Sequence, residues 1–457
     1  MRILLLAAVL ATAPLAPYAL AQTVPPPAAA AAAPAGVRAL AAGYKALTLC
    51  SALRNAEAAD GTRSHASVEA NEFVGIYPEL EPLIPDLPVE ITDAGVSVGW
   101  DPAMPPRLAA YRPGAGCAIM PIGWTAPAND AQADHPPARP TVADLPTADP
   151  RGDAAAFAAT LARASDGSYG AGSNTTGMVI IQDDHIVGEH YATGFGPDVP
   201  QRTWSVAKSL AGTLVGAAVQ RGEADVNAPA AIANWRAEGD PRGLITLDNL
   251  MRMASGLTSD TAGNRTDAIY FGGVTVAEQA VTWPLIAPPG SRFRYANNDI
   301  LLAVFSLSPT LDAHSPGDLF AQLGMADTVA ETDWRGAYIL SSQVWSTARD
   351  LARFGLLYVH DGVQDGRRIL PEGWRDYVSR PSGPQPPTGA FGYGATFWLM
   401  NRSEGVPADT IAAFGNRGQY VVIVPGRKIV IVRRGEDPAG KTFDIAVFTR
   451  DVLAALD

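Results

Sequence analysis

The chain has 457 residues, of which 47% are hydrophobic, 18% charged and 8% aromatic. This composition excludes a disordered protein, and the length suits one large or two ordinary domains with a sizeable core. The formal net charge of -12 argues against a nucleic-acid partner, because nucleic-acid binding requires a basic face.

The first residues have the pattern of a secretory signal peptide. Arg2 precedes an apolar run at residues 3–11, two prolines then interrupt it, and Ala-Leu-Ala at 19–21 is a small-x-small cleavage pattern. The alternative is a membrane anchor, but a span needs about 20 uninterrupted apolar residues. We therefore predict a signal peptide at 1–21, cleavage after Ala21, no stable membrane insertion afterwards, and a periplasmic or secreted protein.

The only cysteines are Cys50 and Cys117. An even pair in an exported protein can close a disulfide, and a loop of this length would stabilise the fold by about 4 kcal/mol in the chain-entropy model. The alternative is two separate thiols. Neither cysteine belongs to a CxxC pattern or a histidine cluster, so the sequence indicates no metal site.

The composition divides the rest of the chain into three parts. Residues 22–40 are rich in Ala and Pro and predict an extended tether. Residues 41–150 form a Pro-rich N-terminal region, with strand-like stretches such as 89–91, that we expect to pack on the main domain at 151–457.

The main domain alternates between strand and helix patterns. We expect, in chain order, strands at 176–182 and 185–191 joined by Asp183-Asp184, a helix at 205–220, helical patterns at 249–251, 301–305 and 347–354, strands at 420–424 and 429–432, and a last helix toward Leu456. This order predicts an α/β (α+β) fold: one antiparallel sheet built from both chain ends, flanked by helices, with an inserted mainly helical region at roughly 210–345.

Two serine patterns compete for the role of nucleophile. Residues 95–99 match the nucleophile elbow G-x-S-x-G, which requires a strand that turns sharply into a helix. Proline-rich residues follow at 100–106, and these cannot begin a helix. We interpret the alternating Val-Ser-Val as an ordinary strand with Ser97 on its wet face.

The second pattern is Ser205-Val206-Ala207-Lys208. On a helix, residues three apart share a face, and Ser205 would lie at the positive helix end. Only four of the 34 basic residues are lysines, so a lysine in an apolar helix is informative here. A desolvated lysine can lose its proton and act as a base, whereas arginine stays charged; the alternative is a surface lysine whose stem lies on apolar neighbours.

Two later motifs follow in order. Tyr295-Ala296-Asn297 comes after a Pro-Gly turn and precedes a helical pattern, so Tyr295 can relay a proton and Asn297 can hold a substrate carbonyl. Gly415-Asn416-Arg417 precedes the strand at 420–424, and a backbone N–H there would form an oxyanion hole together with the N–H of Ser205. Read alone, the glycine-rich stretch is equally a hairpin turn.

The ordered trio resembles the three active-site elements of the penicillin-recognising serine hydrolases, which include class C β-lactamases, D-alanyl-D-alanine carboxypeptidases and family VIII esterases. The resemblance runs from about Leu49 to the C-terminus and is strongest to the 6-aminohexanoate-dimer hydrolase branch. The stretches that carry it are 49–52, 204–209, 346–355, 369–374 and 418–420.

The resemblance implies a cofactor-free serine hydrolase domain at 151–457. Ser205 would attack an amide or ester carbonyl, Lys208 and Tyr295 would move the proton, and Asn297, Gly415, Asn416 and Arg417 would contact substrate, with Asn416 as the second oxyanion donor. Most β-lactamases and carboxypeptidases have a lysine at the head of the third motif, where this chain has Phe414 and Gly415. We therefore favour a general amidase or esterase over a β-lactamase, with Arg417 as the candidate replacement for the missing cation.

Other functions remain as alternatives. One is a family VIII-type esterase, β-lactamase or D-amino peptidase; another is a non-catalytic, cell-wall-sensing protein on the same fold. The six histidines form no metal motif, and no nucleotide-binding fingerprint occurs in a strand-to-helix context, so we expect no metal and no cofactor.

Overall fold

The computed structural model describes residues 33–125, 141–258, 266–381 and 383–457. The predicted signal peptide at 1–21 and the tether up to residue 32 lie outside these ranges. Within them, no helix is long and apolar enough to cross a membrane.

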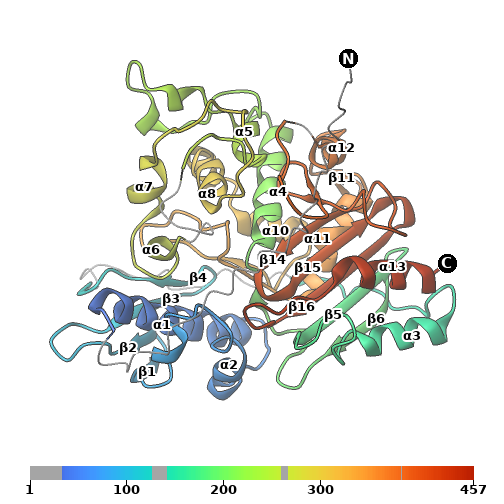
Figure 1. The fold of residues 1–457 in the computed structure, drawn as a ribbon, viewed down its shortest axis with the longest axis horizontal. Helices are drawn as coiled ribbons and strands as arrows, with labels where there is room; N and C mark the ends of the chain where they lie inside the picture. The colour runs from blue at the N-terminus through green and yellow to red at the C-terminus, as the bar shows by residue number, and fades with distance from the viewer. Residues whose placement is uncertain (1–32, 126–140, 259–265, 382) are drawn as a thin grey trace, which may run out of the picture.

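A seven-stranded antiparallel sheet forms the centre of the main domain, in the order β12-β13-β14-β15-β16-β5-β6 (Figure 1). Its strands are β5 (Thr175–Gln182), β6 (His185–Tyr191), β12 (Gly392–Tyr393), β13 (Trp398–Leu399), β14 (Ile411–Gly415), β15 (Gln419–Val424) and β16 (Ile429–Gly435). Because β16 pairs with β5, the sheet joins segments from the two ends of the domain. The predicted fold class is confirmed.

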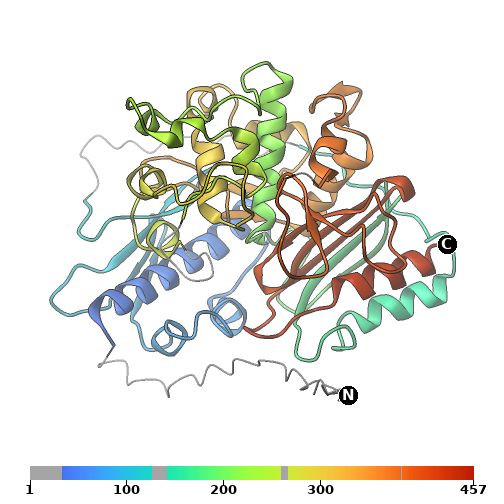
Figure 2. The ribbon, with the colours of Figure 1, turned by 45° about the horizontal axis from the view of Figure 1, so that its top comes forward.

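Both faces of the central strands β5, β15 and β16 are covered, which explains why these strands are fully buried and mainly apolar. Met178 and Ile180 of β5 face α3 (Ala154–Arg163) and α13 (Ile445–Ala455), whereas their neighbours Val179 and Ile181 belong to the core on the other face. Figure 2 shows α3 and α13 side by side along the sheet. Helices α4 (Val206–Gln220) and α11 (Ala348–Val359) pack on the opposite face.

Between β7 (Gln201–Arg202) and β9 (Val344–Ser346) the chain is mainly helical. This part contains α5 (Leu247–Met251), α6 (Asp267–Tyr270), α7 (Val276–Gln279), α8 (Asn297–Phe305), α9 (Ser308–Leu311), α10 (Pro316–Gln322) and the short strand β8 (Val329–Ala330). Helix α4 lies between these helices and the sheet, and its residues 206–218 are all buried. A helix buried on every side desolvates any polar side chain that it carries.

The chain between α11 and β12 adds two short elements. These are the hairpin β10 (Val363–Gln364) with β11 (Arg367–Arg368) and the helix α12 (Trp374–Ser379). Trp374 is buried against α4, where a side chain at Gly216 would collide with its indole ring.

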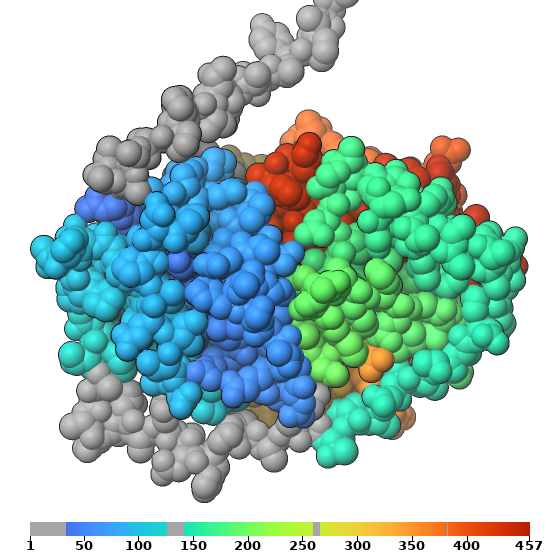
Figure 3. Space-filling view, turned by 90° about the horizontal axis from the view of Figure 1, so that it is seen from below, coloured from blue at the N-terminus to red at the C-terminus, as the bar shows by residue number. Residues whose placement is uncertain are grey.

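The N-terminal region has its own four-stranded antiparallel sheet, in the order β1-β2-β3-β4. Its strands are β1 (Val89–Thr92), β2 (Gly95–Val98), β3 (Arg107–Arg112) and β4 (Gly116–Ile119); α1 (Ala35–Ala58) packs across them and α2 (His65–Asn71) follows. Figure 3 shows this region, in blue, directly against the main domain in green and red.

Three sequence-based predictions can be compared with this region. The tether was expected to reach residue 40, but α1 already begins at Ala35, so its last six residues are helical. Ser97 lies in β2 between the buried Val96 and Val98, and its interpretation as a strand residue is confirmed. The Cys50–Cys117 disulfide is also confirmed; it joins α1 to β4.

Candidate active site

Ser205 is the residue at which the chain turns from the loop after β7 into α4. It is the N-cap of this helix, but its side chain makes no capping hydrogen bond. The preceding Trp204 has a left-handed backbone conformation with φ of 49°. The Ser205 hydroxyl therefore lies at the positive end of the helix while remaining available to another partner.

That partner is Lys208. Its Nζ lies 2.9 Å from Ser205 Oγ, 2.7 Å from Asn297 Oδ1 and 2.7 Å from the carbonyl oxygen of Ser341. The last two atoms only accept hydrogen bonds. A neutral lysine amine has two N–H bonds and one lone pair, so donation to both carbonyl oxygens leaves the lone pair directed at the Ser205 hydroxyl.

The environment of Lys208 favours this neutral form. The residue is 1% exposed, and no carboxylate among the described residues pairs with it. Burial lowers the pKa of Lys208 well below its ordinary value, and the positive charge of Arg202 acts in the same direction. Arg202 is itself buried and stacks on Trp204, with its guanidinium carbon 3.8 Å from the ring centre.

Tyr295 comes from the segment before α8 and completes the group around Ser205. Its ring centre is 5.2 Å from Lys208 Nζ. Burial raises the pKa of Tyr295 to about 12, although polar interactions with Ser205 and Trp398 act in the opposite direction. Tyr295 therefore keeps its proton at neutral pH, and the pair is suited to a neutral amine as base and a phenol as acid.

Aromatic rings continue from Tyr295 along the edge of the sheet. Tyr295 packs on Trp398 at 5.3 Å between ring centres, and Trp398 stacks on Phe414 at 5.8 Å. Tyr393 contacts both Tyr295 and Trp398. Tyr393 is buried, whereas Tyr295, Trp398 and Phe414 are partly buried and form one flank of the site.

Asn297 makes hydrogen bonds within the protein at both ends of its side-chain amide. Its Oδ1 accepts the hydrogen bond from Lys208, and its Nδ2 donates to Thr266 Oγ1 at 3.2 Å. Both polar ends of the amide are thus used within the protein, and the side chain is 9% exposed. The structure thus places Asn297 where it orients Lys208, and the contact with a substrate carbonyl stays a prediction.

The third motif lies beside the nucleophile at the end of β14. Gly415 is packed so closely that a Cβ there would be 2.4 Å from the carbonyl oxygen of Thr203 and 3.2 Å from Ser205 N. Only glycine allows this approach. Asn416 follows directly, so its backbone comes next to the first turn of α4, where the Ser205 N–H lies.

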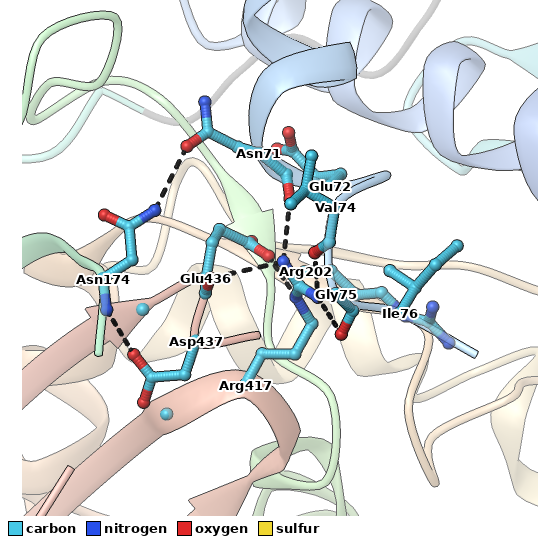
Figure 4. A network of polar contacts seen from close by, with 12 residues as sticks. Asn71, Glu72, Val74, Gly75, Ile76, Asn174, Arg202, Arg417, Glu436 and Asp437 are labelled. Carbon is cyan, nitrogen blue, oxygen red and sulfur yellow. Dashed lines mark hydrogen bonds and ion pairs between the residues drawn. The ribbon is translucent and has the colours of Figure 1, made fainter. Parts of the chain in front are cut away.

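The Arg417 guanidinium is fully engaged within the protein, which argues against its predicted role as replacement for the missing cation. Its guanidinium pairs with Glu436 at 2.5 Å and donates to the carbonyl oxygens of Asn71, Val74 and Gly75. Figure 4 shows it directed at the N-terminal region. Because every nitrogen of this buried group is engaged, Arg417 cannot replace the missing lysine as an anchor for a substrate carboxylate.

Sequence patterns missed three contributors. The first is the Ser341 carbonyl oxygen, which accepts a hydrogen bond from Lys208. The Ser341 side chain is held in turn by a 2.6 Å hydrogen bond between its hydroxyl and that of Tyr270. Arg202 and Trp398 modify the pKa of Lys208 and Tyr295, respectively. A backbone carbonyl has no sequence signal, but Arg202 lies within the Arg-Thr-Trp-Ser stretch that leads into the nucleophile.

Comparisons with known proteins identify the family of this chain. The family model described as Beta-lactamase matches residues 157–434, which is more than half of the chain. The 6-aminohexanoate-dimer hydrolase of Paenarthrobacter ureafaciens is 27% identical over 300 residues, covering 58% of this chain and 73% of that protein.

Solved structures share the fold. A protein of Bacillus anthracis assigned as a 6-aminohexanoate-dimer hydrolase aligns with a TM-score of 0.54 at 21% identity, covering 68% of this chain and 86% of its own. A penicillin-binding protein homologue from Caulobacter crescentus aligns with a TM-score of 0.53 at 17% identity, covering 68% and 99%. This chain therefore belongs to the β-lactamase family and is a serine hydrolase.

Proposed function

We propose that the protein hydrolyses small amides or esters through an acyl-enzyme on Ser205, with Lys208 as general base and Tyr295 as general acid. The observation that carries this proposal is the 2.9 Å contact between Lys208 Nζ and Ser205 Oγ. The two remaining polar partners of this amine are acceptors only, which leaves its lone pair for the serine proton.

The chemistry begins when Lys208 takes the proton of Ser205 and Oγ bonds to the substrate carbonyl carbon. The carbonyl oxygen becomes an oxyanion that accepts hydrogen bonds from the N–H groups of Ser205 and Asn416. Tyr295 gives its proton to the leaving nitrogen or oxygen as the bond to carbon breaks, and it regains a proton from the Lys208 ammonium. A water molecule then attacks the acyl-enzyme by the same steps in reverse and frees Ser205.

The substrate class rests on the relatives and on Arg417. One relative is named for the dimer of 6-aminohexanoate, and a dimer of an amino acid is a small amide. A β-lactam is less favoured, because Phe414 and Gly415 stand where a lysine is usual and Arg417 is bound to Glu436. Esterase and D-amino peptidase activities use the same machinery and remain alternatives.

We further propose that the protein is exported. The signal-peptide pattern at 1–21 and the Cys50–Cys117 disulfide both suit an oxidising compartment. The alternative of a non-catalytic sensor is disfavoured because both the nucleophile and its lysine are present in contact.

The test is labelling with a fluorophosphonate probe followed by peptide mass spectrometry. We expect one covalent adduct, on Ser205, and we expect that Ser205→Ala loses both the adduct and ester hydrolysis. The matched control is Ser97→Ala, which removes the serine of the literal G-x-S-x-G pattern and should label like the parent. A folded protein without an adduct on Ser205 would overturn the mechanism and favour the sensor.

A further inference from the structure

A cavity of about 200 Å³ lies next to the nucleophile, between the two regions of the protein. Its lining comes from three segments, Gly75–Pro78 of the N-terminal region, Asn416–Arg417 of the third motif and Asp437–Lys441 of the loop after β16, together with Trp204. We propose that this cavity binds the acyl part of the substrate and accepts a short apolar chain that ends in a carboxylate. The proposal rests on the proposed acyl-enzyme on Ser205.

The position of the cavity assigns it to the acyl group. Trp204 directly precedes the nucleophile, and Asn416 carries the second proposed oxyanion N–H. Tyr295 is not among the described residues that line it. The leaving group must lie toward Tyr295 to receive its proton, so the other substituent of the carbonyl carbon extends along the opposite flank, into the cavity.

Residues Gly75–Pro78 of the N-terminal region form one wall of the cavity, and hydrogen bonds hold this wall in place. Arg417 joins it to the third motif through the carbonyl oxygens of Asn71, Val74 and Gly75 (Figure 4). Gly75 has φ of 65°, and a Cβ there would be 2.5 Å from Pro438. These residues lie outside the segment 157–434 that matches the family model.

The lining also indicates the chemistry of the ligand. Ile76, Tyr77, Pro78 and Trp204 present apolar surface, which suits methylene groups. Two of the charged residues are neutralised: Arg417 pairs with Glu436 at 2.5 Å, and Asp437 pairs with Arg433 at 2.9 Å.

Lys441 is the remaining charge. Its stem lies over Gly172, and its amine has no ion-pair partner among the described residues. An unpaired cation among the residues that line an apolar cavity favours a carboxylate at the end of the acyl chain.

The experiment compares p-nitrophenyl esters that differ only in the acyl group, so the leaving group stays constant. We expect the parent protein to hydrolyse the monoester of succinate or glutarate about fivefold faster, in kcat/KM, than the butyrate or pentanoate ester with the same number of carbons, after the uncatalysed rate of each ester is subtracted. Lys441→Met should remove this preference and Lys441→Glu should reverse it. The control Lys428→Met changes an exposed lysine at the distant β15–β16 turn and should keep the preference.

A second variant tests the wall itself. Tyr77→Ala enlarges the cavity and should move the preference, as the ratio of kcat/KM values, toward longer or aromatic acyl groups. If Ser205 is acylated but neither Lys441 nor Tyr77 substitutions alter the acyl preference, the subsite assignment is wrong. If no ester acylates Ser205, the proposed function fails instead, so the two failures are distinguishable.

Discussion

The N-terminal region and the main domain each pack a buried helix against an antiparallel sheet, and each helix carries a buried lysine. In α1, Lys45 Nζ donates to the carbonyl oxygens of Ile84 and Leu87, both at 2.9 Å. In α4, Lys208 has two similar acceptors and also Ser205 Oγ. Burial lowers the pKa of both lysines. A depressed pKa is therefore not sufficient for catalysis; the hydroxyl partner distinguishes the base from a structural lysine.

The largest expected difference between the two lysines is in activity. Lys208→Met should reduce kcat/KM by about 1000-fold, because it removes the general base. Lys45→Met should leave kcat/KM within a factor of two. It should instead lower the free energy of unfolding by about 1–3 kcal/mol, since two buried carbonyl oxygens lose their donor.

The measurements are ester hydrolysis and denaturant unfolding of both variants. Lys208→Arg sharpens the comparison, because arginine keeps the charge but cannot act as a base. Activity near that of the parent in Lys208→Arg would show that the lysine only supplies a positive charge.

The second largest expected effect is the loss of activity on removal of the Tyr295 hydroxyl, the proposed general acid. Tyr295→Phe should lower the hydrolysis of an amide by about 100-fold, because the leaving amine must be protonated as it departs. The hydrolysis of a p-nitrophenyl ester should be lowered less, since p-nitrophenolate departs as an anion and needs no proton. Equal losses on the two substrates would contradict the role of Tyr295 as proton donor. Tyr111→Phe in β3 of the N-terminal region is the matched control.

The pH profile tests the protonation states of the pair. Only neutral Lys208 can accept a proton, so kcat/KM should fall by about tenfold per pH unit once the pH drops below its lowered pKa. Tyr295, with a pKa of about 12, stays protonated through the neutral range and should cause no alkaline limb below that pH. A rate that rises as the pH falls would contradict the assignment of base and acid.

Removal of the disulfide should have the smallest effect on activity, although it should lower stability. Cys50 and Cys117 are 67 residues apart, and loss of their bond should cost about 4 kcal/mol of unfolding free energy in the chain-entropy model. The double variant Cys50→Ala with Cys117→Ala should unfold at lower denaturant concentration, yet Ser205 should still be labelled by a fluorophosphonate. Loss of labelling in a folded double variant would show that the reactivity of Ser205 depends on the disulfide between α1 and β4.

The amino-acid sequence by itself was enough to predict the helices and strands that have a strong local pattern. The hairpin at Asp183-Asp184, the helix after Ser205 and the strand at Tyr420 follow from runs of apolar residues and turn residues. It was also enough to prefer Ser205 over Ser97, because the residues after Ser97 cannot form a helix. The disulfide followed from there being only two cysteines, although the sequence left two separate thiols open.

Only the tertiary structure decided where polar groups find their partners. The sequence did not predict α1, because a helix of mainly small residues that is buried over most of its surface shows no two-sided pattern. It also did not predict the protein partners of Asn297 and Arg417, which come from distant segments, Lys208 for the amide and Asn71 to Gly75 for the guanidinium. Spacing along a chain indicates which side chains share an element, but the packing of elements determines which buried donors meet which acceptors.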